Sequence, residues 1–97
     1  MRIKFSPEVT SELKKIKKKD LKLTSRIEKQ LELFDQNPKH PSLRTHKLTG
    51  KIENRWSIAI NISLRMVYVV IEGQENEEQT AYFVAIGTHD QAYRDKK

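Results

Sequence analysis

Apolar residues between positions 9 and 34 recur every three or four residues, as they do on one face of an α-helix. They form two groups, which are Val9, Leu13 and Ile16, then Leu23, Ile27, Leu31 and Phe34. This spacing predicts two helices, each with one apolar side. Residues 1–5, which precede both groups, predict a short strand.

Residues with a known preference for helix ends mark where these two helices begin and stop. Ser6 is suited to cap the first helix, and Pro7 to occupy its first position. Asp20 is suited to cap the second helix. Asn37 precedes Pro38, and a residue before proline avoids the helical region, so the second helix is predicted to stop there.

After residue 54 the pattern changes to the alternation and β-branched runs typical of strands. Three such runs follow, at residues 56–62, 64–71 and 80–86. Gly87 is predicted to end the third strand, and residues 88–93 to form a last helical turn. Residues 39–54 are polar and irregular, which predicts a loop with a short edge strand at about 44–48.

This order of elements predicts an α+β fold in a single domain, residues 1–97. A chain of 97 residues has room for one core. We expect an N-terminal strand, a helical hairpin and an antiparallel sheet, with the helices packed on one face. The other face is then largely uncovered and available to a partner.

Composition excludes several classes of protein. The chain has no cysteine, which removes a disulfide framework, a thiolate nucleophile and a zinc finger. No apolar run approaches the roughly 18 residues that a membrane helix needs. Residues 1–5 lack the apolar stretch of a secretory signal. We therefore expect a cytoplasmic protein that does not contact a membrane.

The net charge is +6, and the isoelectric point is near 9.7. A small domain with this charge attracts polyanions and meets them faster. Nucleic acid and an acidic protein are both suitable partners, and charge alone does not choose between them.

Four segments resemble the RelE/ParE superfamily of toxins. They read HKLTG at 46–50, WSI at 56–58, LRMVY at 64–68 and AIGTHDQAY at 85–93. The last is similar to the histidine-using, YafQ-like branch. The resemblance implies a toxin of a type II toxin–antitoxin pair that cuts mRNA in the ribosomal A site without a cofactor and is neutralised by a cognate antitoxin. ParE relatives share the fold but inhibit DNA gyrase, so that alternative stays open.

Metal-free RNA cleavage needs a base for the 2′-hydroxyl, a cation for the phosphate and an acid for the leaving oxygen. The resemblance assigns His89 as the acid and Arg65 as the phosphate-binding residue. Histidine and arginine suit these roles chemically. The alternatives are that His89 caps a turn, and that Arg65 pairs with Glu72 or Glu53.

The resemblance also places His46 as a candidate base, in a basic loop where Lys47 and Arg44 are candidates to bind substrate. Tyr93 matches a tyrosine that stacks on a base or assists proton transfer. The alternatives are ordinary loop side chains and a tyrosine that packs the last turn onto the sheet.

One departure from the histidine-using relatives weakens the assignment of the base. Those relatives carry a further histidine and an acidic residue where residues 60–64 offer only Asn61 and Ser63. His40, next to Pro41, is expected to be structural. A metal site of His40, His46 and His89 lacks local ligand spacing, so none is expected.

Overall fold

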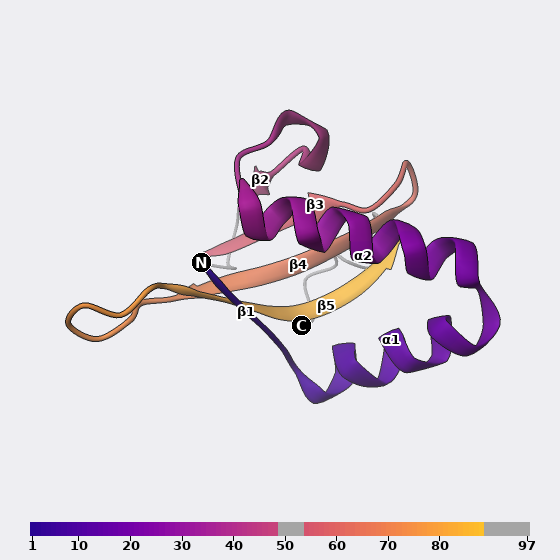
Figure 1. The fold of residues 1–97 in the computed structure, drawn as a ribbon, viewed down its shortest axis with the longest axis horizontal. Coiled ribbons are helices and arrows are strands. Elements are labelled where there is room, and N and C mark those ends of the chain that lie inside the picture. The colour runs from indigo at the N-terminus through magenta and orange to yellow at the C-terminus, as the bar shows by residue number, and fades with distance from the viewer. Residues whose placement is uncertain (49–53, 89–97) are drawn as a thin grey trace.

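The described residues, 1–48 and 54–88, form an α+β unit in this computed structural model. The elements along the chain are β1 (Arg2–Phe5), α1 (Pro7–Lys19), α2 (Leu21–Gln36), the 3₁₀ turn η1 (Pro41–Leu43), β2 (His46–Lys47), β3 (Arg55–Ala59), β4 (Leu64–Ile71) and β5 (Thr80–Thr88). Figure 1 shows α1 and α2 on one side of the sheet. The predicted fold class is confirmed.

The strands lie in the order β1-β5-β4-β3-β2. The predicted antiparallel pairing holds from β2 to β5, whereas β1 pairs with β5 in parallel, so the sheet is mixed. A parallel neighbour requires a long crossover, and the helical hairpin that follows β1 is the first part of that connection.

The predicted helix caps are confirmed. The Ser6 hydroxyl oxygen accepts a hydrogen bond from the Val9 N–H at 3.1 Å, and the Asp20 carboxylate accepts one from the Leu23 N–H at 3.0 Å. The second helix stops at Gln36, immediately before Asn37. Neither α1 nor α2 is both long and apolar enough to cross a lipid bilayer.

The main core lies between the two helices and the sheet. Ile27 and Phe34 from α2 pack with Ile58, Tyr68 and Phe83 from the strands. The ring centroids of Phe34 and Tyr68 are 5.0 Å apart, in an edge-to-face arrangement. Burial raises the pKa of Tyr68 to about 12, because the core disfavours a charged phenolate.

Strand β3 is shorter than predicted, since it ends at Ala59 and not at residue 62. The Asn61 side-chain oxygen accepts hydrogen bonds from the N–H groups of Ser63 and Leu64, at 2.8 and 2.7 Å. Asn61 thus closes a turn between β3 and β4, as asparagine often does. Ile62, which the predicted strand placed on its buried side, is instead 93% exposed.

Strand β5 is longer than predicted, because Gly87 does not end it. Leu64 pairs with Thr88 and Arg65 with Gly87, so the start of β4 gives both residues of β5 a partner. Thr88 is therefore a strand residue. The rest of the predicted helical turn at 88–93 lies outside the described residues. Within the predicted loop, η1 forms, and the edge strand β2 is only two residues long.

The side of the sheet opposite α1 and α2, here called the second face, carries a small apolar cluster. Leu48 and Val67 are buried there and pack against Val84 and Ala85. This cluster lies apart from the main core because side chains alternate across a strand: Val67 points to the second face, and its neighbours Met66 and Tyr68 point to the helices.

Candidate functional site

Strand register brings two of the predicted site residues to the second face. His46 on β2 lies opposite Ser57 on β3, which lies opposite Val67 on β4. Paired residues in a sheet share a face, and so do residues two apart on a strand. His46 and Arg65 therefore lie on the same face as Val67, and a candidate base and a candidate phosphate-binding group share one surface.

Arg65 is the second residue of β4, and hydrogen bonds to this part of the chain hold its guanidinium. The Nη1 atom donates to the carbonyl oxygens of Asn61 at 2.6 Å, Ile62 at 3.2 Å and Leu64 at 3.2 Å. Arg65 does not form the ion pair with Glu72 that was its alternative role. Both carboxylate oxygens of Glu72 instead accept hydrogen bonds from the side-chain amide of Gln79. Glu53, the other proposed partner, lies outside the described residues. The Nε and Nη2 edge of Arg65 has no hydrogen-bond partner within residues 1–48 and 54–88.

Arg44 lies between η1 and β2, and its backbone is left-handed, with φ of 48°. This conformation, uncommon for arginine, ends the 3₁₀ turn and changes the direction of the chain before β2. His40 lies at the other end of η1, where its Nδ1 accepts a hydrogen bond from the Ser42 N–H at 3.1 Å. His40 therefore has the structural role expected for it.

Lys47 lies on the opposite face from His46 and Arg65. It pairs with Trp56, and its Nζ lies 5.8 Å from the centre of the indole ring, within range of a cation–π contact. Trp56 packs against the main core, so the structure keeps Lys47 apart from the other candidates.

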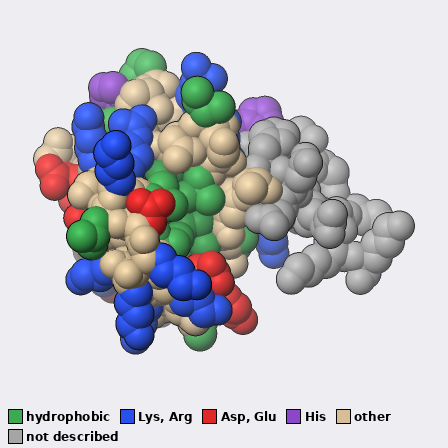
Figure 2. All heavy atoms as spheres, turned by 90° about the vertical axis from the view of Figure 1, so that its right-hand side faces the viewer, with side chains coloured by type: hydrophobic (Ala, Val, Ile, Leu, Met, Phe, Trp, Pro, Cys, Tyr) green, Lys and Arg blue, Asp and Glu red, His purple; other side chains and the backbone are tan. Residues whose placement is uncertain are grey.

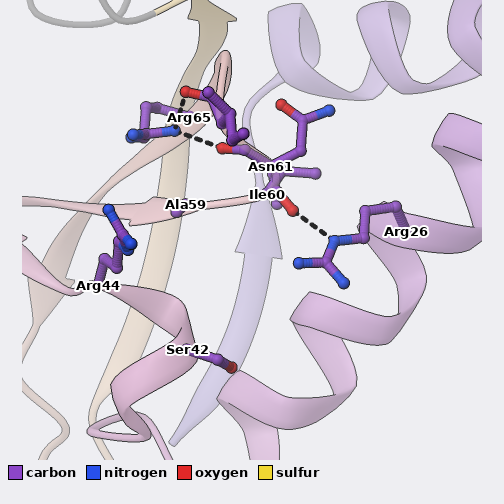
Figure 3. A pocket seen from close by; sticks show the side chains of 8 residues that line it. Arg26, Ser42, Arg44, Ala59, Ile60, Asn61 and Arg65 are labelled. Atoms are coloured by element: carbon purple, nitrogen blue, oxygen red, sulfur yellow. Dashed lines mark hydrogen bonds between the residues drawn. The ribbon is translucent and has the colours of Figure 1, made fainter.

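A cavity of about 380 Å³ opens where α2, η1 and the β3–β4 turn meet. Figure 3 shows the side chains around it, which are Arg26, Ser42, Arg44, Ala59, Ile60, Asn61, Ile62 and Arg65. Sequence reasoning named Arg44 and Arg65 but missed Arg26. No local signal marks Arg26, because an arginine beside the apolar side of a helix is a common surface residue.

The family of the chain follows from comparison with known proteins. The family profile described as "ParE toxin of type II toxin-antitoxin system, parDE" matches residues 3–93, nearly the whole chain. The chain belongs to this family of toxins. No curated protein sequence matches it.

Solved structures share the fold of this toxin at low sequence identity. A YoeB/ParE toxin from Agrobacterium tumefaciens is 19% identical, with a TM-score of 0.75 over 92% of this chain and 99% of that one. A chain of the YoeB–YefM complex from Staphylococcus aureus is 23% identical, with a TM-score of 0.71 over 92% and 97%. YafQ from E. coli is 16% identical, with a TM-score of 0.68 over 97% and 100%. These structures therefore have the same fold as this chain.

Two of the toxin's predicted site residues, His89 and Tyr93, lie outside the described residues. In the part of the chain that is described, His, Asp and Glu side chains form no group of three that would hold a metal ion. Among the described residues, the candidate site therefore comprises His46 and Arg65 on the second face, with Arg44 and Arg65 lining the cavity.

Proposed function

We propose that this toxin is a ribosome-dependent endoribonuclease that cuts mRNA in the A site. The 2′-hydroxyl of one nucleotide attacks the adjacent phosphorus, and the P–O5′ bond breaks. The products are a 2′,3′-cyclic phosphate and a 5′-hydroxyl. The observation that carries this proposal is that His46 and Arg65 share one sheet face, since a base and a phosphate-binding cation have to act on the same nucleotide.

Strand β5 supports the role of His89 as the general acid. Gly87 lies opposite Arg65, and His89 follows it by two residues. His89 would protonate the leaving 5′-oxygen, and His46 would remove the 2′-hydroxyl proton.

Arg65 would stabilise the charge that develops on the phosphate. Its Nη1 is occupied by turn carbonyls, which leaves the Nε and Nη2 edge for two parallel hydrogen bonds to phosphate oxygens. Tyr93 would stack on a base of the substrate strand, and Arg44 would contact its backbone.

A cognate antitoxin is the proposed protein partner. Solved structures with the same fold include a YoeB–YefM complex and a DinJ–YafQ complex. We propose that an antitoxin covers the second face of this toxin in the same kind of assembly. The proposed site of action is the cytoplasm, where ribosomes translate mRNA.

The direct test is cleavage of mRNA by the purified toxin on programmed ribosomes kept in Mg²⁺, because EDTA dissociates ribosomes, and on free RNA with and without EDTA. Cleavage should be efficient on ribosomes, and weak but unchanged by EDTA on free RNA. His89→Ala should lower the cleavage rate about a hundredfold, as expected when a general acid is lost, and Arg65→Ala should be comparably damaging. Lys14→Ala, on the exposed side of α1, is the control for lost charge. Loss of the free-RNA cleavage in EDTA would show that the mechanism needs a metal.

The alternative function is inhibition of DNA gyrase, which the ParE name of the matching family favours. Gyrase inhibition requires binding to the enzyme and not the chemistry of His89 and Arg65. If the double variant His89→Ala, Arg65→Ala remains fully toxic and the toxin blocks DNA supercoiling by gyrase, the alternative is correct.

A further inference from the structure

We propose that the cavity between α2, η1 and the β3–β4 turn binds a phosphate group of the RNA strand, next to the phosphate that Arg65 would hold for cleavage. The ligand class is a phosphate ester, and Arg26 is the residue that this proposal adds. It rests on the proposed function only in taking RNA as the source of the phosphate.

Three arginines from three separate elements line this cavity. Arg26 belongs to α2, Arg44 to the segment after η1, and Arg65 to the start of β4. Like charges repel, so such a group is unfavourable unless an anion compensates it. Within the described ranges no carboxylate lies within ion-pair distance of any of the three, since the two ion pairs there join Met1 to Glu78 and Lys15 to Glu12.

Two of the arginines are held in place by the same turn. Arg26 donates from Nε to the carbonyl oxygen of Ile60 at 2.7 Å, and Arg65 donates from Nη1 to that of Asn61 at 2.6 Å, as Figure 3 shows. Each keeps further N–H groups with no acceptor among residues 1–48 and 54–88. Side chains that are already ordered lose less entropy when they bind, which favours a preformed anion site.

A buried amide fixes the walls of the cavity. Gln30 on α2 is 1% exposed, and its Nε2 donates to the carbonyl oxygen of Ala59 at 2.9 Å and to that of Ser42 at 3.4 Å. One side chain thus ties α2 to the end of β3 and to η1. Because a buried amide without partners is costly, these contacts resist separation of the three elements.

The arrangement suits a phosphate better than a carboxylate. One planar guanidinium satisfies both oxygens of a carboxylate, whereas a phosphate has further oxygens that accept from other directions. The Ser42 hydroxyl also lines the cavity, and exposed Ile62 lies at its edge, where a sugar or base would make an apolar contact. Figure 2 shows several groups of Lys and Arg side chains on this side of the molecule, with fewer Asp and Glu side chains. The positive charge would therefore attract an incoming RNA strand to this side of the molecule.

Arg65 connects the cavity to the second face, because it lines the cavity and lies on the same side of β4 as Val67. A phosphate bound in the cavity and the phosphate at the cleavage position would then be close to each other along the RNA strand. Arg26 would act in substrate binding, on a nucleotide that is not itself cut.

The test measures binding and needs no cleavage. Inorganic phosphate is titrated into the uniformly ¹⁵N-labelled toxin, and a single-stranded RNA oligonucleotide with 2′-deoxy substitutions, which is not cleavable by 2′-hydroxyl attack, is then bound to each variant. Phosphate should shift the amide signals of Asn61 and Ile62 in a saturable way. Arg26→Gln and Arg44→Gln should each weaken oligonucleotide binding roughly tenfold, as for loss of one charge-assisted hydrogen bond.

Lys14→Gln removes one charge from the exposed side of α1 and is the matched control, expected to weaken binding less than about twofold. Arg44→Gln keeps the test valid if Arg26→Gln disturbs the turn, because the Arg44 side chain donates no hydrogen bond to the described residues. Thermal unfolding confirms that each variant is folded. Equal losses of oligonucleotide affinity in Arg26→Gln, Arg44→Gln and Lys14→Gln would overturn the proposal. So would an acidic peptide that displaces the bound oligonucleotide more effectively than inorganic phosphate does.

The outcome is separable from that of the proposed function. If the toxin does not cut mRNA but oligonucleotide binding depends on Arg26, the cavity is a phosphate site and the ribonuclease proposal fails. If the toxin cuts mRNA and Arg26→Gln binds the oligonucleotide like the Lys14→Gln control, the ribonuclease proposal stands and the cavity proposal fails.

Discussion

Arg65 shows how one residue serves both the fold and the candidate site. An arginine in an apolar strand is costly unless its charge is compensated. Here the carbonyl oxygens of Asn61, Ile62 and Leu64 compensate it in part, and the same contacts orient the remaining edge of the guanidinium. The side chain therefore stabilises its own turn before any ligand arrives. Sequence reasoning found this residue from its unusual position but not its backbone partners.

A second single residue, Tyr68, leads to a prediction of how the stability of the fold depends on pH. Its pKa is raised to about 12 by burial, whereas an unfolded tyrosine titrates near 10. The neutral phenol is favoured in the folded state, so this contribution to stability is complete below pH 10 and is lost as the pH rises towards 12. We expect the free energy of unfolding to fall by about 2–3 kcal/mol over that interval.

The measurement is urea unfolding, followed by circular dichroism, from pH 9 to 12. Tyr68→Phe should remove most of the decline, because phenylalanine does not titrate, whereas Tyr82→Phe, on a half-buried residue, is the control and should keep it. A decline of the same size in Tyr68→Phe and in the unmodified chain would contradict the prediction.

At the scale of elements, short-range signals decided where the helices begin. Ser6 is 5% exposed, and its hydroxyl satisfies the N–H of Val9, one of the groups that a helix leaves without a partner in its first turn. Strand ends were harder to predict, because β3 and β5 stop where their neighbours in the sheet stop. The β3–β4 turn, closed by Asn61, sets both the end of β3 and the position of Arg65.

Ser6→Ala tests the first cap. Loss of the hydroxyl leaves the Val9 N–H without its partner, and we expect the free energy of unfolding to fall by about 1 kcal/mol. The matched control is Ser11→Ala, an exposed position inside α1, where alanine should be neutral or slightly stabilising. Chemical denaturation of the two variants side by side provides the comparison. Equal effects at positions 6 and 11 would mean that the cap contributes nothing.

At the scale of the whole molecule, the net charge of +6 governs encounters more than it governs the fold. Basic side chains are spread over the last turn of α1 and the cavity region, and the β4–β5 connection carries much of the acidic charge. An acidic antitoxin and an RNA strand would both approach the basic side. Complementary charge raises association rates more than it raises final affinity.

A salt series on the association of the toxin with its cognate antitoxin tests this. We expect the association rate to fall by roughly tenfold or more from low to high salt, and dissociation to change little. A variant with Lys14, Lys17 and Lys18 changed to glutamine should show a shallower dependence, because fewer charges attract the partner. An association rate that stays flat across the series in the unmodified toxin would rule out electrostatic capture.

Local interactions explain why so much of the secondary structure was predictable from the sequence. The caps at Ser6 and Asp20, the helical spacing of the apolar residues and the run at 64–71 act over a few neighbouring positions, so each is readable without knowing the rest of the fold. The observed bounds of β4 match the predicted ones. That the helices leave the other face of the sheet uncovered also followed from the order of elements, because a helical hairpin covers only one face.

By itself, the sequence determined the α+β order of elements, the helix boundaries, the basic character of the chain and the resemblance on which the candidate residues rest. Only the tertiary structure decided which side chains meet. The register of β2 against β3 puts His46 on the face of Arg65 and Lys47 on the other, and the packing of α2 against the β3–β4 turn brings Arg26 to a cavity shared with Arg44 and Arg65. The physical reason is that helical and strand periods act between near neighbours, whereas register and helix–sheet contacts join residues far apart in the chain and depend on the whole core at once.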